Sequence, residues 1–416
     1  MGRRKQTPEY RPIKDAHKTL GLWSIRRALT FAFTAAVVLL VAAWFLLLWL
    51  LGSPTHAEPM PLDTKDVLEL LKLVFALVAG VGALVALVTA YRRQRVDEAA
   101  GERAERVQAH VEYGQAVELL GHDKAAVRLG GLYSLERLAQ DHPYYRQTVT
   151  DVVCSYLRMP FKSPFTDHGG QADRSRQPDD HTPHDPETSD APLQELQVRL
   201  TAQRLLKRHL TITSPDQEPP PTYWGGINID LTGAHLVDFE FTHCRPREAR
   251  FLEAHFNGVS VFDGAHFDGP VWFNRALFSG SASFMGARFS GITGFFKVRF
   301  GETSFDLVNF GEIAMFAMSH FNGNVEFFGA HFENDAFFDN IHCKGDASFK
   351  NAQFGRQVHF REARFGGTAS FEEAHFRDEP DFAEAVASYP NDDHVWPRCW
   401  RAQAIAGDAA QLTRCS

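Results

Sequence analysis

The sequence predicts a membrane-anchored α + β-solenoid protein, with two transmembrane helices, a helical region and a solenoid in that order. Three observations support this fold class. Two long apolar segments stand near the N-terminus, a helix-forming region follows, and phenylalanine recurs at steps of five and six residues through the last part of the chain. The formal net charge of -8 favours solubility and disfavours binding to a nucleic-acid backbone.

Residues 1–27 form a basic N-terminal segment, and residues 28–51 contain no charged side chain. A bilayer core of about 30 Å needs roughly 20 helical residues, so residues 28–51 are predicted to form transmembrane helix 1. The alternative is a cleaved signal peptide, for which Thr55-His56-Ala57 resembles a cleavage site. The apolar region of a signal peptide spans only about 7–15 residues, which is shorter than this segment.

Residues 67–90 are predicted to form transmembrane helix 2, because their only charged side chains are Glu69 and Lys72 near the start. The loop at 52–66 is short and acidic, whereas arginines follow the second span from Arg92 onward. The positive-inside rule then predicts a two-pass protein of the plasma (inner) membrane, with cytoplasmic N- and C-termini and an extracytoplasmic loop. The lipid bilayer is therefore one predicted partner.

Residues 91–159 are predicted to be a cytoplasmic helical region, because strong helix formers fill the segments between the breaks at 121–123 and 141–143. Residues 160–192 are rich in Pro, Asp and Ser without an apolar run, which predicts a disordered linker. Its three histidines, His168, His181 and His184, are interpreted as solvated residues rather than metal ligands.

Residues 193–212 are predicted to form a further helix that caps the start of the solenoid, since an open end of a β-solenoid exposes unpaired backbone groups. Lys207 and Arg208 lie in its last turn. They either complement the helix dipole or contact a phosphate group.

A phenylalanine ladder predicts the solenoid, because steps of five and six residues fit neither an α-helix nor a flat sheet. The predicted core residues are Phe251, Phe256, Phe262, Phe267, Phe273, Phe278, Phe284, Phe289, Phe295, Phe300, Phe316, Phe321, Phe327, Phe332, Phe338, Phe349, Phe354, Phe360, Phe365, Phe371, Phe376 and Phe382. Cys343 occupies one position of the ladder. A small residue stands two positions before most of them, so both point inward from a short strand.

The solenoid is predicted over residues 227–383, and residues 384–416 are predicted to form a C-terminal cap or tail that includes Trp396 and Trp400. About seven coils spaced by ~4.8 Å would give a rod roughly 30–35 Å long.

The array resembles the pentapeptide-repeat family. Residues 230–236, with the sequence DLTGAHL, are close to that family's unit, and the remainder is similar to its Phe-rich variant with alternating five- and six-residue units. The resemblance implies a right-handed quadrilateral parallel β-helix, in which each unit forms one face. The layout of the whole chain also resembles bacterial membrane-anchored pentapeptide-repeat proteins.

Two departures from the repeat are visible. Pro246 falls on an expected core position, and the segment Cys244 to Arg247 is predicted to interrupt the array. Around Phe300, Phe305 and Phe310 the six-residue step is lost, which predicts a shift in the register of the faces.

No motif for catalysis, cofactor binding or metal binding is found, so no catalytic, cofactor-binding or metal-ligating residue and no cofactor is predicted. Histidines precede several ladder positions and are expected to point outward in rows: His255, His266, His320, His331, His342 and His375. Arg288 and Arg364 occupy equivalent positions. A metal-binding row is one interpretation, and a solvated position that accepts any polar residue is the other.

These features predict a non-enzymatic, membrane-tethered scaffold or protein-interaction module that presents a rigid rod to an unknown protein partner. No nucleic-acid partner is expected, and self-association into a homo-oligomer is left open. The alternative is a DNA-mimicking regulator of a DNA-processing enzyme such as gyrase, which the resemblance and the acidic rod suggest.

Overall fold

The computed structural model describes residues 64–161, 164, 190–212, 218–388, 394–405 and 409–415, with single positions between Thr34 and Trp49. The chain divides into two compact units, Met1–Val107 and Gln108–Ser416. The basic segment 1–27 and most of the predicted span 28–51, of the loop 52–66 and of the linker predicted over 160–192 lie outside the described residues. The last two residues of the predicted linker belong to helix α6.

The prediction of two transmembrane helices is wrong for the described part of the chain, where no helix is both long and apolar enough to cross a membrane. Residues 67–90 are not a separate apolar helix. They belong to α2 (Thr64–Leu120), which carries Glu69 and Lys72 near its start and continues through the charged stretch from Arg92 to Glu118. The predicted two-pass location in the inner membrane is overturned by the same finding.

The helical region predicted before the solenoid is confirmed, and its elements are short helices with apolar faces. They are α3 (Ala125–Asp141), the 3-10 turn η1 (Pro143–Tyr145), α4 (Arg146–Arg158) and α6 (Ala191–Leu210). Gly131 of α3 allows close packing on the end of α2, since a Cβ there would lie 2.6 Å from the backbone nitrogen of Leu120.

Two glutamines of these helices satisfy the backbone at the first strands of the solenoid. The Gln147 side chain accepts from the Asn228 N–H at 3.0 Å and donates to the Asn228 carbonyl at 2.9 Å. Gln203 makes the same pair of bonds with Val237, at 3.1 and 2.9 Å. The strand edge that an open solenoid would expose to solvent is therefore capped by side-chain amides.

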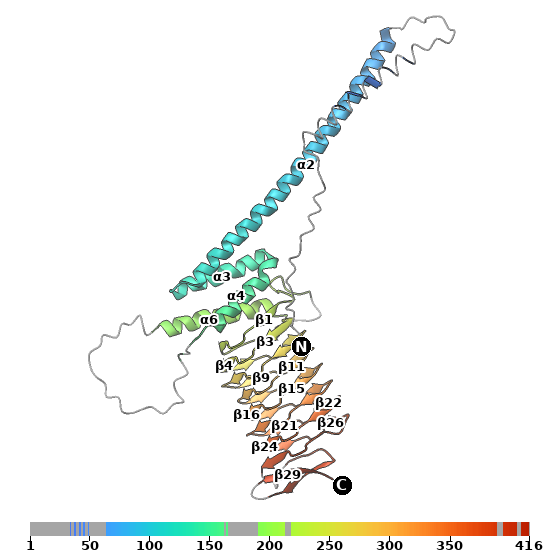
Figure 1. Ribbon diagram of the computed structural model, residues 1–416. Coiled ribbons are helices and arrows are strands. Elements are labelled where there is room, and N and C mark those ends of the chain that lie inside the picture. The colour runs from blue at the N-terminus through green and yellow to red at the C-terminus, as the bar shows by residue number, and fades with distance from the viewer. Residues whose placement is uncertain are drawn as a thin grey trace, which may run out of the picture. The chain divides into compact units, whose positions relative to one another are not determined.

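The solenoid has four parallel sheets, one for each side of the coil (Figure 1). The first sheet comprises β1 (Asn228–Asp230), β3 (Glu248–Arg250), β7 (Val271–Trp272), β11 (Thr293–Gly294), β15 (Ala314–Met315), β19 (Ala336–Phe337) and β23 (Val358–His359). The second comprises β2 (His235–Val237), β4 (His255–Asn257), β8 (Leu277–Phe278), β12 (Arg299–Phe300), β16 (His320–Phe321), β20 (His342–Cys343), β24 (Arg364–Phe365), β27 (Val386–Ser388), β29 (Ala409–Arg414) and β28 (Trp400–Ala404).

The third and fourth sheets complete each coil. The third comprises β5 (Ser260–Val261), β9 (Ala282–Ser283), β13 (Thr303–Ser304), β17 (Val325–Glu326), β21 (Ala347–Ser348) and β25 (Ala369–Ser370). The fourth comprises β6 (His266–Phe267), β10 (Arg288–Phe289), β14 (Asn309–Phe310), β18 (His331–Phe332), β22 (Gln353–Phe354) and β26 (His375–Phe376). The chain visits the sheets in the order first, second, third, fourth, so the first and second sheets are neighbouring faces.

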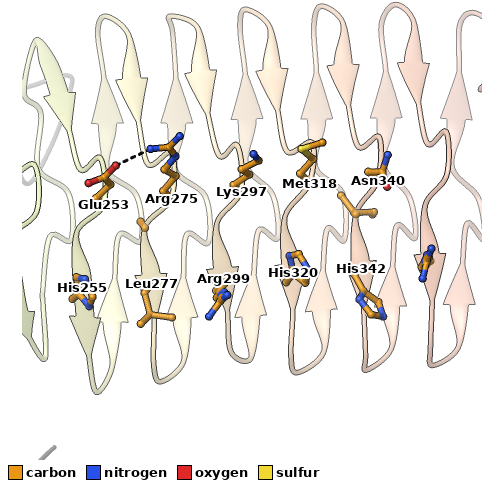
Figure 2. A pocket seen from close by; sticks show the side chains of 13 residues that line it. Glu253, His255, Arg275, Leu277, Lys297, Arg299, Met318, His320, Asn340 and His342 are labelled. Carbon is orange, nitrogen blue, oxygen red and sulfur yellow. Dashed lines mark hydrogen bonds and ion pairs between the residues drawn. The ribbon is translucent and has the colours of Figure 1, made fainter.

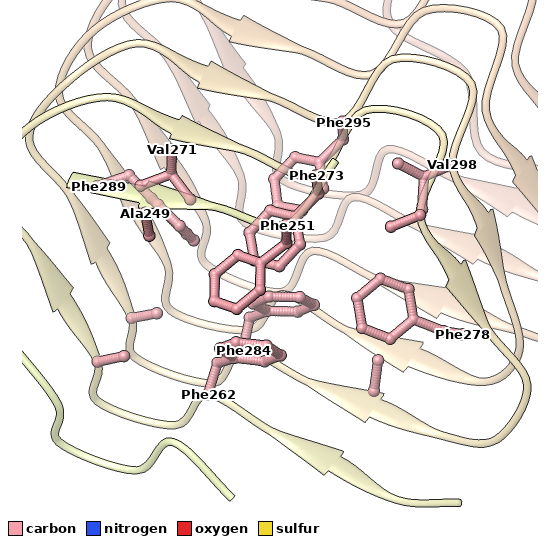
Figure 3. Close-up of a cluster of buried hydrophobic side chains, with 14 of the residues drawn as sticks. Ala249, Phe251, Phe262, Val271, Phe273, Phe278, Phe284, Phe289, Phe295 and Val298 are labelled. Carbon is pink, nitrogen blue, oxygen red and sulfur yellow. The ribbon is translucent and has the colours of Figure 1, made fainter. Parts of the chain in front are cut away.

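The ladder phenylalanines lie inside the four sheets in stacked columns (Figure 3). Every member of the predicted ladder is buried except Phe376, which is half-buried, and Cys343 is also buried. Successive rings of a column stack in parallel, as Phe251 does on Phe273 with a centroid distance of 4.7 Å. Phe239, Phe241, Phe305 and Phe310 join the same core.

Tight turns with a left-handed residue join the first sheet to the second. The Ala254 N–H donates to the Phe251 carbonyl at 3.2 Å, and Glu253 between them has φ 55°. This is the geometry of a type II turn, which glycine adopts most easily. In the following coils the same corner is occupied by Arg275, Lys297 and Met318, all with positive φ.

The predicted shift of register near Phe300 does not occur. Phe305 stacks between Phe284 at 4.7 Å and Phe327 at 4.9 Å, and β13 pairs in parallel with both β9 and β17. Residues at equivalent corners here are 21 apart rather than 22, so one coil is one residue shorter while every face keeps its alignment.

The predicted interruption at Cys244 to Arg247 does not break the solenoid either. The Arg245 N–H donates to the Leu210 carbonyl at the end of α6, and the His266 N–H donates to the Cys244 carbonyl of the preceding coil. The array therefore continues past Pro246, because backbone hydrogen bonds join this segment to its neighbours on both sides.

An antiparallel hairpin closes the other end. Strand β29 pairs with β27 and with β28, which extends the second sheet past the last coil. The Trp396 ring lies 5.9 Å from Phe371 and 6.0 Å from Phe382, and the Trp400 ring lies 5.5 Å from Phe382. These indoles cover the last ladder rings.

Candidate functional site

The structure divides the predicted histidine row between two opposite faces. Strands of the second sheet carry His255, Leu277, Arg299, His320, His342 and Arg364 in register. Strands of the fourth sheet carry His266, Arg288, Asn309, His331, Gln353 and His375 in register. Histidines therefore alternate with other residue types on both faces.

Within the part of the chain that the structure describes, no group of three or more His, Cys, Asp and Glu side chains is arranged to hold a metal ion. Neighbouring histidines on the second sheet contact each other instead. The rings of His235 and His255 stack with their centroids 4.7 Å apart, and those of His320 and His342 are tilted with their centroids 5.7 Å apart.

A basic groove of about 830 Å³ runs along the second sheet and the corner that precedes it. Figure 2 shows its two parallel rows of side chains. The corner row is Glu253, Arg275, Lys297, Met318 and Asn340, and the strand row is His255, Leu277, Arg299, His320 and His342, continued by Arg364. We call this set the basic groove.

The groove carries an excess of positive charge. Arg275 forms an ion pair with Glu253 at 3.0 Å, but no carboxylate among the described residues pairs with Lys297, Arg299 or Arg364. Burial lowers the pKa of His342, and the nearby His320, Arg364 and Lys344 lower it further. The groove therefore already disfavours an additional positive charge, as a site for anions would.

The outward side of the first sheet is apolar in its middle part, between Arg250 and His359. Trp272, Gly294, Met315 and Phe337 follow one another in register on adjacent strands. Ile292, Ile313 and Phe296 flank this row, and Ile292 is 36% exposed. We call Trp272, Ile292, Phe296, Ile313, Met315 and Phe337 the apolar patch.

The Trp272 indole packs closely on Gly294, because a Cβ on that glycine would lie 2.6 Å from the ring. Glycine is therefore needed at this position to leave room for the indole.

The apolar patch and the basic groove form one continuous surface. They lie on neighbouring sheets and share the corner at Lys297, whose ammonium group is 5.1 Å from the centre of the Phe296 ring. An apolar row and a row of cations thus border each other along this corner.

The third sheet, opposite the first, has a different character. Exposed Met285, Leu307 and Phe328 lie there among carboxylates that include Asp306 and Glu326. Burial raises the pKa of Glu326, and repulsion from Asp306 and Glu302 raises it further. Negative charge therefore gathers on this face while positive charge gathers on the groove.

Part of the groove was predicted from the sequence, since His255, His320, His342 and Arg364 belong to the outward rows expected there. The apolar patch, Lys297 and Arg299 were not predicted. These residues stand at outward positions between the ladder residues. A signal was present, because equivalent residues of successive coils are 21 or 22 apart, and alignment of the coils at that period places both rows in register.

A family model described as pentapeptide repeats (9 copies) matches residues 251–299, 327–375 and 349–387. Together with the four parallel sheets and the stacked columns, this match shows that the solenoid is a pentapeptide-repeat domain. Comparison with curated proteins and with solved structures gave no match.

Proposed function

We propose that the chain is a non-enzymatic interaction module, whose solenoid binds a partner protein through the apolar patch and the basic groove. The observation that carries this proposal is the apolar row Trp272, Met315 and Phe337, held outward on a rigid sheet beside unpaired cations. Aromatic and methionine side chains at the centre of such a surface contribute most of the binding energy in protein complexes.

Rigidity supports this role. Short strands, stacked rings and backbone pairing in every coil fix the positions of the surface side chains before a partner arrives. A pre-formed surface avoids the free-energy cost of ordering on binding.

The structure gives less support to imitation of DNA. A DNA-like surface needs continuous negative charge, whereas Lys297, Arg299 and Arg364 place positive charge on the second sheet and its corner. The negative charge on the third sheet is moreover interrupted by the exposed Met285 and Phe328.

The test is chemical crosslinking in the native host cells, followed by capture of the full-length chain. The variant F296S/F337S removes two aromatic rings from the apolar patch. The control variant F328S removes an exposed ring from the opposite face. We expect the crosslinked partner to be lost with F296S/F337S and kept with F328S, whereas the reverse pattern would contradict the proposal.

A further inference from the structure

We infer that the partner contributes an acidic amphipathic helix, which lies along the solenoid axis with its carboxylates in the basic groove and its apolar side chains on the apolar patch. This inference rests on the proposed function and names the chemistry of the partner.

Charge complementarity is the first argument. Lys297 and Arg299 lie side by side on the corner and strand rows, and neither has a carboxylate partner among the described residues. Both side chains are exposed, so carboxylates of a partner can reach them, and the complex itself would exclude water from the ion pairs that form.

Spacing is the second argument. Equivalent residues of successive coils are separated by about 4.8 Å, the distance between neighbouring strands. Successive turns of an α-helix are about 5.4 Å apart, whereas alternate residues of an extended strand are about 6.6 Å apart. The corner row therefore matches the spacing of adjacent helical turns. Lys297 is the unpaired cation of this row, and Arg275, one coil away, is already paired with Glu253.

The arrangement of the two surfaces is the third argument. The apolar patch and the basic groove meet along the corner at Lys297 and Phe296. A helix lying over this corner would turn one side to each surface. Its apolar stripe would cover Met315 and Phe337 while its acidic edge enters the groove.

A nucleic acid fits this surface less well. Its charge extends on all sides and would meet Glu253 at the end of the groove, as well as the carboxylates Glu302 and Asp306 on the third sheet, which adjoins the groove. The apolar patch would also remain uncovered. A helix with one acidic edge confines its charge to the groove.

The experiment measures fluorescence anisotropy of a labelled amphipathic peptide of three heptads, with leucine on one face and glutamate on the other, titrated with the full-length chain. A matched peptide with lysine in place of glutamate and a short duplex DNA serve as comparison probes. We expect saturable binding of the glutamate peptide only. Stronger binding of the DNA, or no binding of the glutamate peptide, would overturn the inference.

Charge reversal in the groove provides the site-specific test. K297E/R299E is expected to weaken binding of the glutamate peptide about tenfold or more. R288E/R377E makes the same change of charge at exposed positions on the fourth sheet and is expected to leave binding within about twofold. Equal effects of the two variants would show that net charge, and not the groove, governs binding.

The same variants separate this inference from the proposed function. If the partner captured in cells is lost with F296S/F337S but kept with K297E/R299E, the solenoid is an interaction module whose partner is not recognised by acidic groups. If neither variant changes the captured partner, the proposed function itself fails.

A second observation supports an independent inference about the C-terminal hairpin. We infer that Cys399 and Cys415 form a disulfide bond when the chain meets a disulfide oxidant. Both thiols are exposed, and they stand opposite each other one step beyond the pair Trp400 and Arg414. The Cys415 N–H donates to the Cys399 carbonyl at 2.8 Å.

The backbone geometry is suitable for this bond. Hydrogen-bonded partners in an antiparallel pair have Cα atoms about 5.5 Å apart, within the range of roughly 4.4–6.8 Å that a disulfide bridges. The other cysteines do not compete, because burial raises the pKa of Cys154, Cys244 and Cys343 to about 12 in each case.

The reaction is a thiol–disulfide exchange with oxidised glutathione. One thiolate attacks the oxidant, which forms a mixed disulfide and releases one glutathione thiolate. The second cysteine then attacks the mixed disulfide and releases the other glutathione. Two cysteine thiols are thereby oxidised, and one glutathione disulfide is reduced to two thiols.

The test incubates the full-length chain with oxidised glutathione, blocks remaining thiols and maps peptides by mass spectrometry. We expect a peptide pair linked through Cys399 and Cys415, and a stable glutathione adduct on Cys415 in the variant C399S. Stable glutathione adducts on both cysteines of the unmodified chain, or disulfide-linked dimers, would contradict the inference.

Discussion

At the residue scale, each ladder phenylalanine is held by rings on several sides. Phe327 stacks on Phe305 and Phe349 at 4.9 Å each and meets the edges of Phe316 and Phe338 at 5.5 Å each. Because the column has neighbours both along and across the solenoid, removal of one ring leaves a cavity that the short strands cannot collapse to fill.

Replacement of Phe327 by alanine is therefore expected to lower the free energy of unfolding by about 3–5 kcal/mol. The matched control is Glu326→Gln at the adjacent outward position. Folding raises the pKa of this carboxyl, so its charge opposes folding at neutral pH and the neutral amide should be tolerated or slightly stabilising. Urea denaturation of both variants checks this, and equal loss of stability would contradict the assigned core.

The corner residue Lys297 offers a second test at this scale, because its φ of 59° is unfavourable for any side chain with a Cβ. Lys297→Gly relieves that conformation, although the groove loses a cation. The free energy of unfolding, measured by thermal unfolding, should therefore change by less than about 1 kcal/mol. Lys297→Val places a β-branched residue there and should destabilise by more. A large loss of stability in the glycine variant would show that the lysine side chain supports the fold.

At the scale of the element, the second sheet combines backbone pairing with a titratable row. His342 has a lowered pKa in the free chain, so the unfolded state binds protons more readily and stability falls as the pH drops below the ordinary histidine value of about 6.5. Carboxylates of a bound acidic peptide would raise the pKa of His342, since they favour the protonated ring.

Affinity for the glutamate peptide is therefore expected to rise as the pH falls from about 7.5 to about 5.5, a range in which the peptide carboxylates stay ionised. The groups that face His342 are His320, Arg364 and Lys344. Anisotropy titrations of the unmodified chain and of H320Q/H342Q at both pH values check this. The variant should lose most of the pH dependence, and weaker binding by the unmodified chain at the lower pH would contradict the account.

Elements with repeated sequence could be predicted, and elements defined by tertiary contact could not. Most ladder positions from Phe251 to Phe382 follow from spacing alone, because a column of rings needs the same residue in every coil. Phe305 and Phe310 were left out, since one coil is a residue shorter there. Phe239 and Phe241 were missed, since the first coil follows a different step and closes against α6.

At the scale of the whole molecule, the second unit is held together by a buried arginine between the helices. Arg199 donates to Glu195 at 2.8 Å and to the carbonyls of Leu157 and Met159 at 3.0 and 2.8 Å. These bonds join the end of α4 to α6, and both helices contact the first strands of the solenoid. The guanidinium group of Arg199 therefore holds α4 and α6 together, and these two helices form the cap at the start of the solenoid.

Arg199→Ala is expected to destabilise the cap by about 1–3 kcal/mol, because it leaves the carbonyls of Leu157 and Met159 without this buried donor. Glu195 keeps its hydrogen bonds from Tyr156 and Arg128. Limited proteolysis should then cut within α4 or α6 at low protease concentration. The control Arg204→Ala changes an exposed arginine of the same helix and should leave the pattern unchanged. Similar cleavage of both variants would show that Arg199 does not secure the cap.

The proposed binding surface was only partly predicted at this scale. A ladder reports which residues point inward, and the sequence alone gives no alignment of Trp272, Met315 and Phe337 until the length of each coil is known. The membrane prediction failed for a related reason. Apolar composition over 67–90 was assessed by itself, whereas the structure joins it to the charged remainder of α2.

Site-specific photocrosslinking tests the central claim most directly. A photoreactive phenylalanine analogue would replace Phe337 on the apolar patch or Phe328 on the opposite face, in the full-length chain expressed in the native host. The account predicts a crosslinked partner protein from position 337 and none from position 328. A partner captured from 328 alone, or equally from both positions, would show that the apolar patch and the basic groove are not the binding surface.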